Sequence, residues 1–306
     1  MKQTIELHKV SEMHQLGGLP NPKHPLISVI HNRDLKTVSG AQGVKIINHL
    51  YTIIFKSSSA CSNFSYGRNT YDYEEGTLVF TAPGQVMEFT DDQTENSPID
   101  PKGWTLVFHS DLFRKSDLAD KMSKYSFFHY DSNESLHVSD LERDSIEDLL
   151  EKIVIEYNQT LDRHSQNLIL SNIELFLDYC LRFYDRQFFS RTNLNTDTVS
   201  KFERFLINYY VSDQVLNQGV PSVESCATAL HLSPNYLTDL LKKETGKTTL
   251  EHIHLFIIDK PKNNLLNSSE SISEIAYSLG FDYPQRFSNL FKSKTGMSPT
   301  EYRHLN

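Results

Sequence analysis

A short pattern that occurs twice near the end of the chain constrains the fold more than any other feature of the sequence. The first copy spans Ser222–Gly246 and the second spans Ser271–Gly296. The leading serine, a central alanine and several apolar positions recur at a constant offset, which grows by one residue after a central turn. Self-similarity at a fixed period indicates one structural unit that is present twice.

Each copy carries the signals of two short helices joined by a tight turn. Each opens with a serine suited to an N-cap, and Ser271 with Glu274 has the spacing of a capping box. Gly280 suits the left-handed conformation after a helix end, while Pro234 and Pro284 suit the first turn of the next helix. A glycine then ends each copy. The pattern predicts two helix-turn-helix units, and a pair of ordinary helical hairpins in a bundle is the alternative.

The same stretch resembles a known family of DNA-binding proteins. The runs "SPNYLTDLLKKETGKT" and "SISEIAYSLGFDYPQRFSNLFKSKTGMSPTEYR" resemble the DNA-binding domain of the AraC/XylS family of bacterial transcription regulators. The resemblance covers residues 197–306. It implies two recognition helices in successive major-groove segments of double-stranded DNA, a homodimer, an activator, and RNA polymerase as a further candidate partner.

Residues in the second helix of each unit are the candidate DNA contacts, because the start of a recognition helix faces base edges and its flanks meet phosphates. Asparagine, glutamine, arginine, serine and threonine can read bases, whereas the lysines one turn later suit phosphates. Asp239 either accepts from a cytosine amino group or pairs with a neighbouring lysine. The candidates are Asn235, Thr238, Asp239, Lys242, Gln285, Arg286, Ser288, Asn289 and Lys292.

A helix predicted over Thr249–Asn267 joins the two units, and it departs from the family pattern at one position. Pro261 stands where the family has alanine. Proline inside a helix removes one hydrogen bond and clashes with the carbonyl four residues earlier, here that of Ile257. We therefore expect a kink that weakens simultaneous engagement of both units.

Charge is distributed unevenly along the chain. The formal net charge is −9. Residues 198–306 hold 11 Lys+Arg and 11 Asp+Glu, so the whole acidic excess lies in the first 197 residues. A neutral DNA-binding domain implies few phosphate contacts and a modest salt dependence.

The sequence upstream of the repeats predicts short strands followed by two helices. Strand-like runs at residues 25–30, 45–56, 77–81 and 104–109, broken by Gly and Pro turns, indicate a sandwich or small barrel, whereas residues 1–20 are predicted to be irregular. The segment "YDYEEGTLVFTAPGQ" resembles the cupin-type sensor domains of AraC relatives over residues 20–110. Such a barrel could hold a small-molecule effector. Its aromatic residues are either a pocket lining or plain core: Phe55, Tyr66, Tyr71, Tyr73, Phe80 and Trp104.

Two apolar stripes predict helices that begin at Ser139 and cover about Ser165–Phe189, with Ser139 and Glu142 forming a capping box. This pair either covers the barrel or forms a dimer interface. The polar segment 191–196 is predicted to be a linker. The expected fold class is therefore α+β: a cupin-like sensor domain at 1–130, a helical dimerisation and linker region at 131–196, and a DNA-binding domain at 197–306.

Several other functions are disfavoured by what the sequence lacks. It has no long apolar run and no signal-peptide pattern, so we predict a cytoplasmic protein without membrane contact. Its Cys61, Cys180 and Cys226 are too scattered for a disulfide framework or a zinc site, and Cys226 is expected in the core. The sole His-x-His, His252–His254, falls in a predicted helix, so no metal, cofactor or enzyme activity is predicted.

The sequence predicts a sequence-specific transcription regulator with an N-terminal sensing domain. Two alternatives stay open: a ligand-independent regulator whose barrel only dimerises, and a cupin enzyme with a regulatory C-terminal domain. Calorimetry against a metabolite library would separate the sensor from the purely dimerising barrel.

Overall fold

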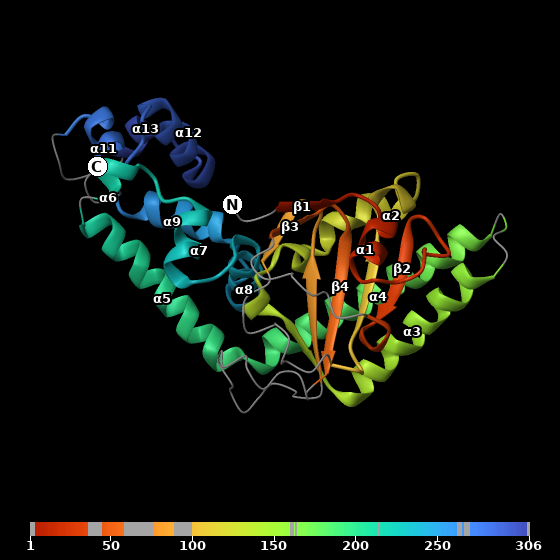
Figure 1. The fold of residues 1–306 in the computed structure, drawn as a ribbon. Coiled ribbons are helices and arrows are strands. Elements are labelled where there is room, and N and C mark those ends of the chain that lie inside the picture. The colour runs from red at the N-terminus through yellow and green to blue at the C-terminus, as the bar shows by residue number, and fades with distance from the viewer. Residues whose placement is uncertain are drawn as a thin grey trace. The chain divides into compact units, whose positions relative to one another are not determined.

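The computed structural model describes residues 4–35, 45–57, 76–88, 100–159, 162, 164–212, 214–261, 265 and 270–304. The chain divides into two compact units, Met1–Ser190 and Arg191–Asn306 (Figure 1). Among the described residues, no helix has both the length and the apolar character needed to cross a bilayer. All the described strands and the tryptophan belong to the first unit, and both repeated motifs belong to the second.

The first unit contains two sheets among its described residues. The smaller has the order β1-β3-β6, in which β1 runs parallel to β3 and β6 runs antiparallel to it. The larger has the order β2-β7-β4-β5-β8 and is antiparallel throughout. The strands are β1 Thr4–Leu7, β2 Ile27–His31, β3 Lys45–Asn48, β4 Tyr51–Ser57, β5 Gly76–Thr81, β6 Gln85–Glu88, β7 Trp104–Phe108 and β8 Leu136–Val138.

The predicted strands are present, with two corrections. The run 45–56 is two strands in different sheets, because the chain turns at Asn48, whose side chain accepts from the Leu50 amide at 3.1 Å and donates to Thr52 Oγ1 at 2.6 Å. Residues 1–20 are not irregular, since they include β1 and the helix α1 (Val10–Leu16). The described strands form open sheets rather than a closed barrel, so the cupin-like barrel is not confirmed.

Aromatic side chains fill the interior of the larger sheet. Phe55 and Trp104 stack with ring centroids 5.5 Å apart, and Phe176 meets Trp104 edge-on at 6.2 Å. Phe55, Phe80 and Trp104 are all buried, which places these three candidate pocket residues in the packed core. The candidate residues Tyr66, Tyr71 and Tyr73, like Cys61, lie outside the described residues.

The two predicted helices are present, and they pack on each other and on the larger sheet (Figure 1). They are α3 (Asp140–Asn158), which begins with the predicted Ser139–Glu142 capping box, and α4 (Ser165–Ser190). Their shared face includes Ile153, Ile173 and Cys180, all fully buried. Shorter helices of this unit include α2 (Asp117–Lys121).

The second unit is helical throughout its described residues. It contains α5 Thr192–Val211, α6 Gln214–Gln218, α7 Val223–Leu230, α8 Pro234–Thr245, α9 Thr249–Asp259, α11 Ile272–Ser278, α12 Pro284–Thr295 and α13 Pro299–Arg303. Its first helix corrects the sequence analysis, because residues 192–196 form the first turns of α5 rather than a linker. This segment has no Gly or Pro, and the Asn195 side chain donates to Glu244 on α8 at 2.8 Å, which ties the turn to the rest of the unit.

The joining helix α9 is shorter than predicted and ends at Asp259, just before Pro261. The last regular bond runs from the Lys260 amide to the Phe256 carbonyl at 3.2 Å. Pro261 has no amide proton to give to Ile257, so the ladder stops there. Helical bonding resumes from the carbonyl of Pro261, which accepts from the Leu265 amide at 2.7 Å. The regular helix is therefore interrupted at Pro261, the residue where the sequence places a kink.

Candidate nucleic-acid interface

The turn of the first motif joins α7 to α8 through a left-handed residue. His231 has φ 57°, and it is the only described non-glycine residue with positive φ. The Leu232 amide donates to Ala227 O at 3.0 Å and the His231 amide to Thr228 O at 3.1 Å, which satisfies the last carbonyls of α7. Ser233 then caps α8 by accepting from the Tyr236 amide.

The turn of the second motif repeats this backbone geometry with glycine in the equivalent place. Gly280 has φ 86°, the Phe281 amide donates to Ala276 O at 3.1 Å, and the Gly280 amide donates to Tyr277 O at 2.9 Å. The predicted left-handed glycine is confirmed. The repeat in the sequence is thus a repeat of the hydrogen-bond pattern, and the inserted residue falls after the shared part of the turn.

Each recognition helix is held by an apolar face. On α8, Leu237, Leu240 and Leu241 are buried. On α12, Phe287 and Phe291 are completely buried, whereas Leu290 is only half-buried. The predicted stops at Gly246 and Gly296 are confirmed by left-handed C-caps.

The outer face of α8 presents two of its four predicted contact residues freely. Asn235 and Lys242 are exposed. Thr238 is half-buried, because its hydroxyl donates to Pro234 O at 2.8 Å and lies 3.1 Å from Thr249 Oγ1. Asp239 is also half-buried. The first motif therefore has a narrow exposed polar face, and the hydroxyl of Thr238 is already hydrogen-bonded inside the protein.

The outer face of α12 is more open. Four of its five predicted contact residues are exposed, namely Gln285, Arg286, Asn289 and Lys292. Gln285 Nε2 donates to Asn289 Oδ1 at 3.3 Å, so these two amides are aligned along the helix. The hydroxyl of Ser288 donates to Pro284 O at 3.1 Å, as Thr238 does in the first motif.

The two helices differ in charge. The twelve residues of α12 include Arg286, Lys292 and Lys294 and no acidic residue. The twelve residues of α8 include Lys242 and Lys243 but also Asp239 and Glu244, so their formal charges cancel. The positive potential that would attract phosphates is therefore concentrated on the second recognition helix.

One residue beside this surface was missed by the sequence analysis. Tyr283 is 61% exposed and precedes α12, and the guanidinium of Arg286 lies over its ring at 5.2 Å from the centroid. A cation–π contact of this kind restricts the arginine side chain before any ligand binds. The signal in the sequence was an aromatic residue three positions before an arginine at a helix start.

A capping carboxylate and a half-buried histidine contribute to the electrostatics around these helices. Hydrogen bonds from the backbone and hydroxyl of Ser271 lower the pKa of Glu274 at the start of α11. Burial lowers the pKa of His252, and Lys247 lowers it further. His252 also shares a 2.6 Å hydrogen bond with Thr245 Oγ1, which braces the end of α8.

Comparison with known proteins agrees with this geometry. A family model described as a helix-turn-helix domain matches residues 226–304. The uncharacterized transcriptional regulatory protein YesN of Bacillus subtilis is 30% identical over 95 residues, which cover 30% of this chain and 26% of that protein. The lactose operon transcription activator of Staphylococcus xylosus is 23% identical over 268 residues, covering 86% of this chain and 88% of that protein.

A solved structure also matches the second unit. The C-terminal domain of AraT, a response regulator from Geobacillus stearothermophilus, is 28% identical and covers 36% of this chain and 85% of its own, with a TM-score of 0.32. That score is too low to support a structural argument. The chain spans between 11% and 40% of the curated relatives that match its C-terminal part alone.

The fold, the paired turns and the family match together define the second unit as a double helix-turn-helix domain. Its relatives support the AraC type, and they are bacterial proteins named as transcriptional regulators or activators.

Proposed function

We propose that this protein is a sequence-specific transcription regulator that reads two successive major-groove segments with α8 and α12. The observation that carries the proposal is the pair of matched turns, each of which presents a recognition helix with a buried apolar face and an exposed polar face. In such motifs the second helix enters the major groove. The full-length relative, whose name describes an operon activator, supports the same role for the whole chain.

The proposed contacts divide by chemistry. Asn235, Gln285 and Arg286 reach base edges, because amide and guanidinium groups can form bidentate contacts with adenine and guanine. Lys242 and Lys292 neutralise phosphates. Thr238 and Ser288 have hydroxyls bonded within the protein, so the proposed role of these two is weaker than their residue types suggest.

Asn289 and Asp239 complete the proposed surface. The Asn289 side chain accepts from Gln285, so the two amides would meet neighbouring bases as one unit. Asp239 either accepts from cytosine or turns toward a lysine of its own helix, and it lowers the positive potential of α8 in both cases.

The first unit is the proposed regulatory part. A sensing segment at 1–130 and a dimerising segment at 131–196 would act on the DNA-binding unit, and the name of the full-length relative makes a sugar the first effector class to test. Apolar side chains on the outer surface of α3 and α4, among them Ile155, Leu168 and Leu175, support dimerisation through this pair. RNA polymerase as a partner and a cytoplasmic location are parts of the same proposal.

Selection of bound fragments from a random duplex pool, with the full-length protein at two salt concentrations, tests the proposal. We expect enrichment of a site with two short elements about one DNA turn apart. The matched variants are Lys292→Ala and Arg204→Ala, since Arg204 is an exposed cation of α5 and belongs to neither recognition helix. Lys292→Ala should lower the slope of log affinity against log salt by about 0.9, and Arg204→Ala should not.

If no DNA sequence is enriched at either salt concentration, with or without added sugars, the proposal of a transcription regulator is contradicted. Enrichment of one element would mean that a single motif binds and that the break at Pro261 uncouples the other.

A further inference from the structure

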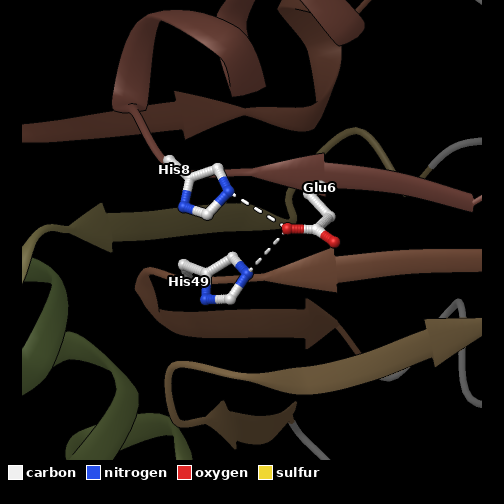
Figure 2. A group of neighbouring side chains, drawn as sticks. All are labelled: Glu6, His8 and His49. Atoms are coloured by element: carbon white, nitrogen blue, oxygen red, sulfur yellow. Dashed lines mark hydrogen bonds and ion pairs between the residues drawn. The ribbon is translucent and has the colours of Figure 1, made fainter.

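Two histidines and a glutamate meet at the end of the small sheet of the first unit. Glu6 and His8 are two residues apart, so an extended chain places them on one face. Leu7 pairs with Asn48 in the parallel register of β1 and β3, and the residues that follow are therefore neighbours. The His49 amide donates to Leu7 O at 2.8 Å, which holds His49 beside His8. Figure 2 shows the three side chains converging from these two strands.

The ligand atoms of this group are close together. The Nε2 atom of His8 lies 3.2 Å from Glu6 Oε2, and the Nε2 atom of His49 lies 3.4 Å from the same oxygen (Figure 2). The two imidazole rings stack with centroids 4.1 Å apart and planes 8° apart. Each residue offers one ligand atom, and the three atoms lie within 4.8 Å of one another.

One of these atoms has an incomplete environment. The Nε2 atom of His49 is buried and lies 3.4 Å from the Glu6 carboxylate, yet it makes no hydrogen bond within the described part of the chain. A buried polar nitrogen without a hydrogen bond is costly, and a metal ion bound between His49 and Glu6 would satisfy it.

We propose that Glu6, His8 and His49 form a binding site for a divalent transition-metal ion, with zinc as the best fit. Zinc takes imidazole nitrogen and carboxylate oxygen at about 2.0–2.2 Å in tetrahedral geometry. The edge of such a tetrahedron is about 3.3 Å. The two nitrogen–oxygen separations have this length. Three protein ligands leave the fourth position to water or to an outside ligand.

Binding requires a small adjustment of the rings. The lone pairs of two parallel rings do not converge on one point, so one imidazole must turn about its Cβ–Cγ bond. The side chains have room for this, since that of His8 is 55% exposed and that of His49 is 35% exposed. The site is therefore a superficial one that orders on binding.

The placement of the site gives the ion a structural effect. β1 is a strand of four residues at the edge of its sheet, and its described strand partner is β3. Glu6 and His8 belong to the β1 segment and His49 follows β3, so the ion joins the two chains across the ladder. Attachment of the N-terminal strand then depends on zinc as well as on its backbone bonds.

Zinc binding by untagged full-length protein tests this proposal. Equilibrium dialysis at pH 7.5 with metal analysis should give one zinc per chain. His8→Gln and His49→Gln should each weaken binding by at least about 10-fold, the smallest loss usual when a metal site is disturbed. His129→Gln, which changes an exposed histidine elsewhere in the same unit, should bind as the natural protein does. Cobalt in place of zinc should show the intense visible absorption of a tetrahedral site.

A second measurement keeps the test independent of folding. Hydrogen exchange of residues 4–8 should slow when zinc is added, and this slowing should vanish in Glu6→Gln. Absence of stoichiometric zinc in the natural protein overturns the proposal and leaves a histidine pair that shares a carboxylate. Full binding in both histidine variants overturns it as well, because zinc would then lie elsewhere.

Discussion

The two helix-turn-helix motifs share one backbone pattern but solve the same turn with different residues. In the first, the left-handed position is His231, which is exposed. In the second it is Gly280, where a Cβ atom would lie 2.7 Å from the carbonyl carbon of Gly219 and 2.8 Å from Val215 Cγ2. The first turn therefore needs only a residue that tolerates positive φ, whereas the second also needs the absence of a side chain. Identical geometry can thus impose different sequence constraints.

The two motifs also differ in the charge and the N-cap of their recognition helices. The first recognition helix is electrically balanced and capped by Ser233, while the second is basic and begins after Tyr283, which makes no side-chain cap. The first motif is therefore suited to local stability and the second to attraction of the phosphate backbone.

Substitution of Gly280 should produce the largest effect. Gly280→Ala combines left-handed strain with contact against the backbone of Gly219, so we expect the second unit to lose about 2–4 kcal/mol. Hydrogen exchange of α11 and α12 in the full chain measures this. Gly246→Ala is the matched control, since its φ is 76° and nothing lies within 4 Å of the added atom. It should cost about 1–2 kcal/mol, and an equal loss in both variants would refute the close-contact argument.

Substitution of Pro261 tests how the motifs are coupled. Pro261→Ala returns an amide proton to the Ile257 carbonyl and lets α9 continue, which should stabilise the second unit by up to about 3 kcal/mol. Binding to a site with two elements should tighten, while binding to one element should not change. Thermal unfolding and titration against both duplexes measure the two effects. If neither the melting temperature nor the affinity for the two-element duplex changes, the break at Pro261 affects neither stability nor DNA binding.

Substitution of Arg286 should distinguish a contact with a base from a contact with the phosphate backbone. Arg286→Ala should weaken binding to the selected site by about 1–3 kcal/mol, or roughly 5-fold to 150-fold, and relax the preference at one base pair. Asn235→Ala is the comparison in the first motif. Titration against the selected duplex and its single-base variants is the measurement. A uniform loss over all sequences would instead assign Arg286 to phosphate.

A fall in pH should destabilise the first helix of the second motif before it destabilises the first helix of the first motif. The cap of α11 uses the Glu274 carboxylate, whose pKa is lowered in the folded protein by the Ser271 backbone hydrogen bond, whereas the cap of α7 uses the uncharged pair Ser222 and Ser225. A lowered folded pKa contributes stability above the unfolded value of about 4.3, which is lost as pH falls through the folded pKa. Exchange of α11 amides should therefore rise below about pH 4 relative to α7. In Glu274→Gln this pH dependence should disappear.

The smallest expected effect belongs to the exposed turn. His231→Gly removes about 1–2 kcal/mol of left-handed strain and adds about 0.5–1 kcal/mol of backbone entropy cost, so a gain of about 0.5–1 kcal/mol remains. A rise of a few degrees in the melting temperature of the second unit is the measurement. Destabilisation would mean that the imidazole makes contacts that strain alone does not describe.

Local signals in the sequence predicted the second unit well, since caps, prolines and stop glycines act within a few residues. Ser271 and Gly280 have the predicted roles, and α9 stops just before Pro261. The left-handed His231 was missed because its side chain gives no local sign of positive φ. The engaged hydroxyl of Thr238 was missed because one of its two partners, Thr249, belongs to another helix.

Side-chain bonds and strand register explain what the hydrophobic pattern could not predict in the first unit. The turn at Asn48 depends on a buried side-chain bond to Thr52, which no hydrophobic pattern records. The group Glu6, His8 and His49 depends on the parallel register of β1 and β3, and a search for His-x-His could not find it. A Glu-x-His pair on a strand was its only sequence signal.

The buried cysteines give each unit an internal reporter of its own opening. Cys180 lies in the core of α4 and Cys226 in the core of α7, and both are fully buried as free thiols. Burial raises the pKa of the Cys226 thiol to about 11 and that of Cys180 well above its ordinary value, so neither is a reactive thiolate in the folded protein. With Cys61 replaced by serine, the rate of alkylation at each remaining thiol would record how often its unit opens. The opening rates of the two units could then be measured separately in one experiment on the full chain.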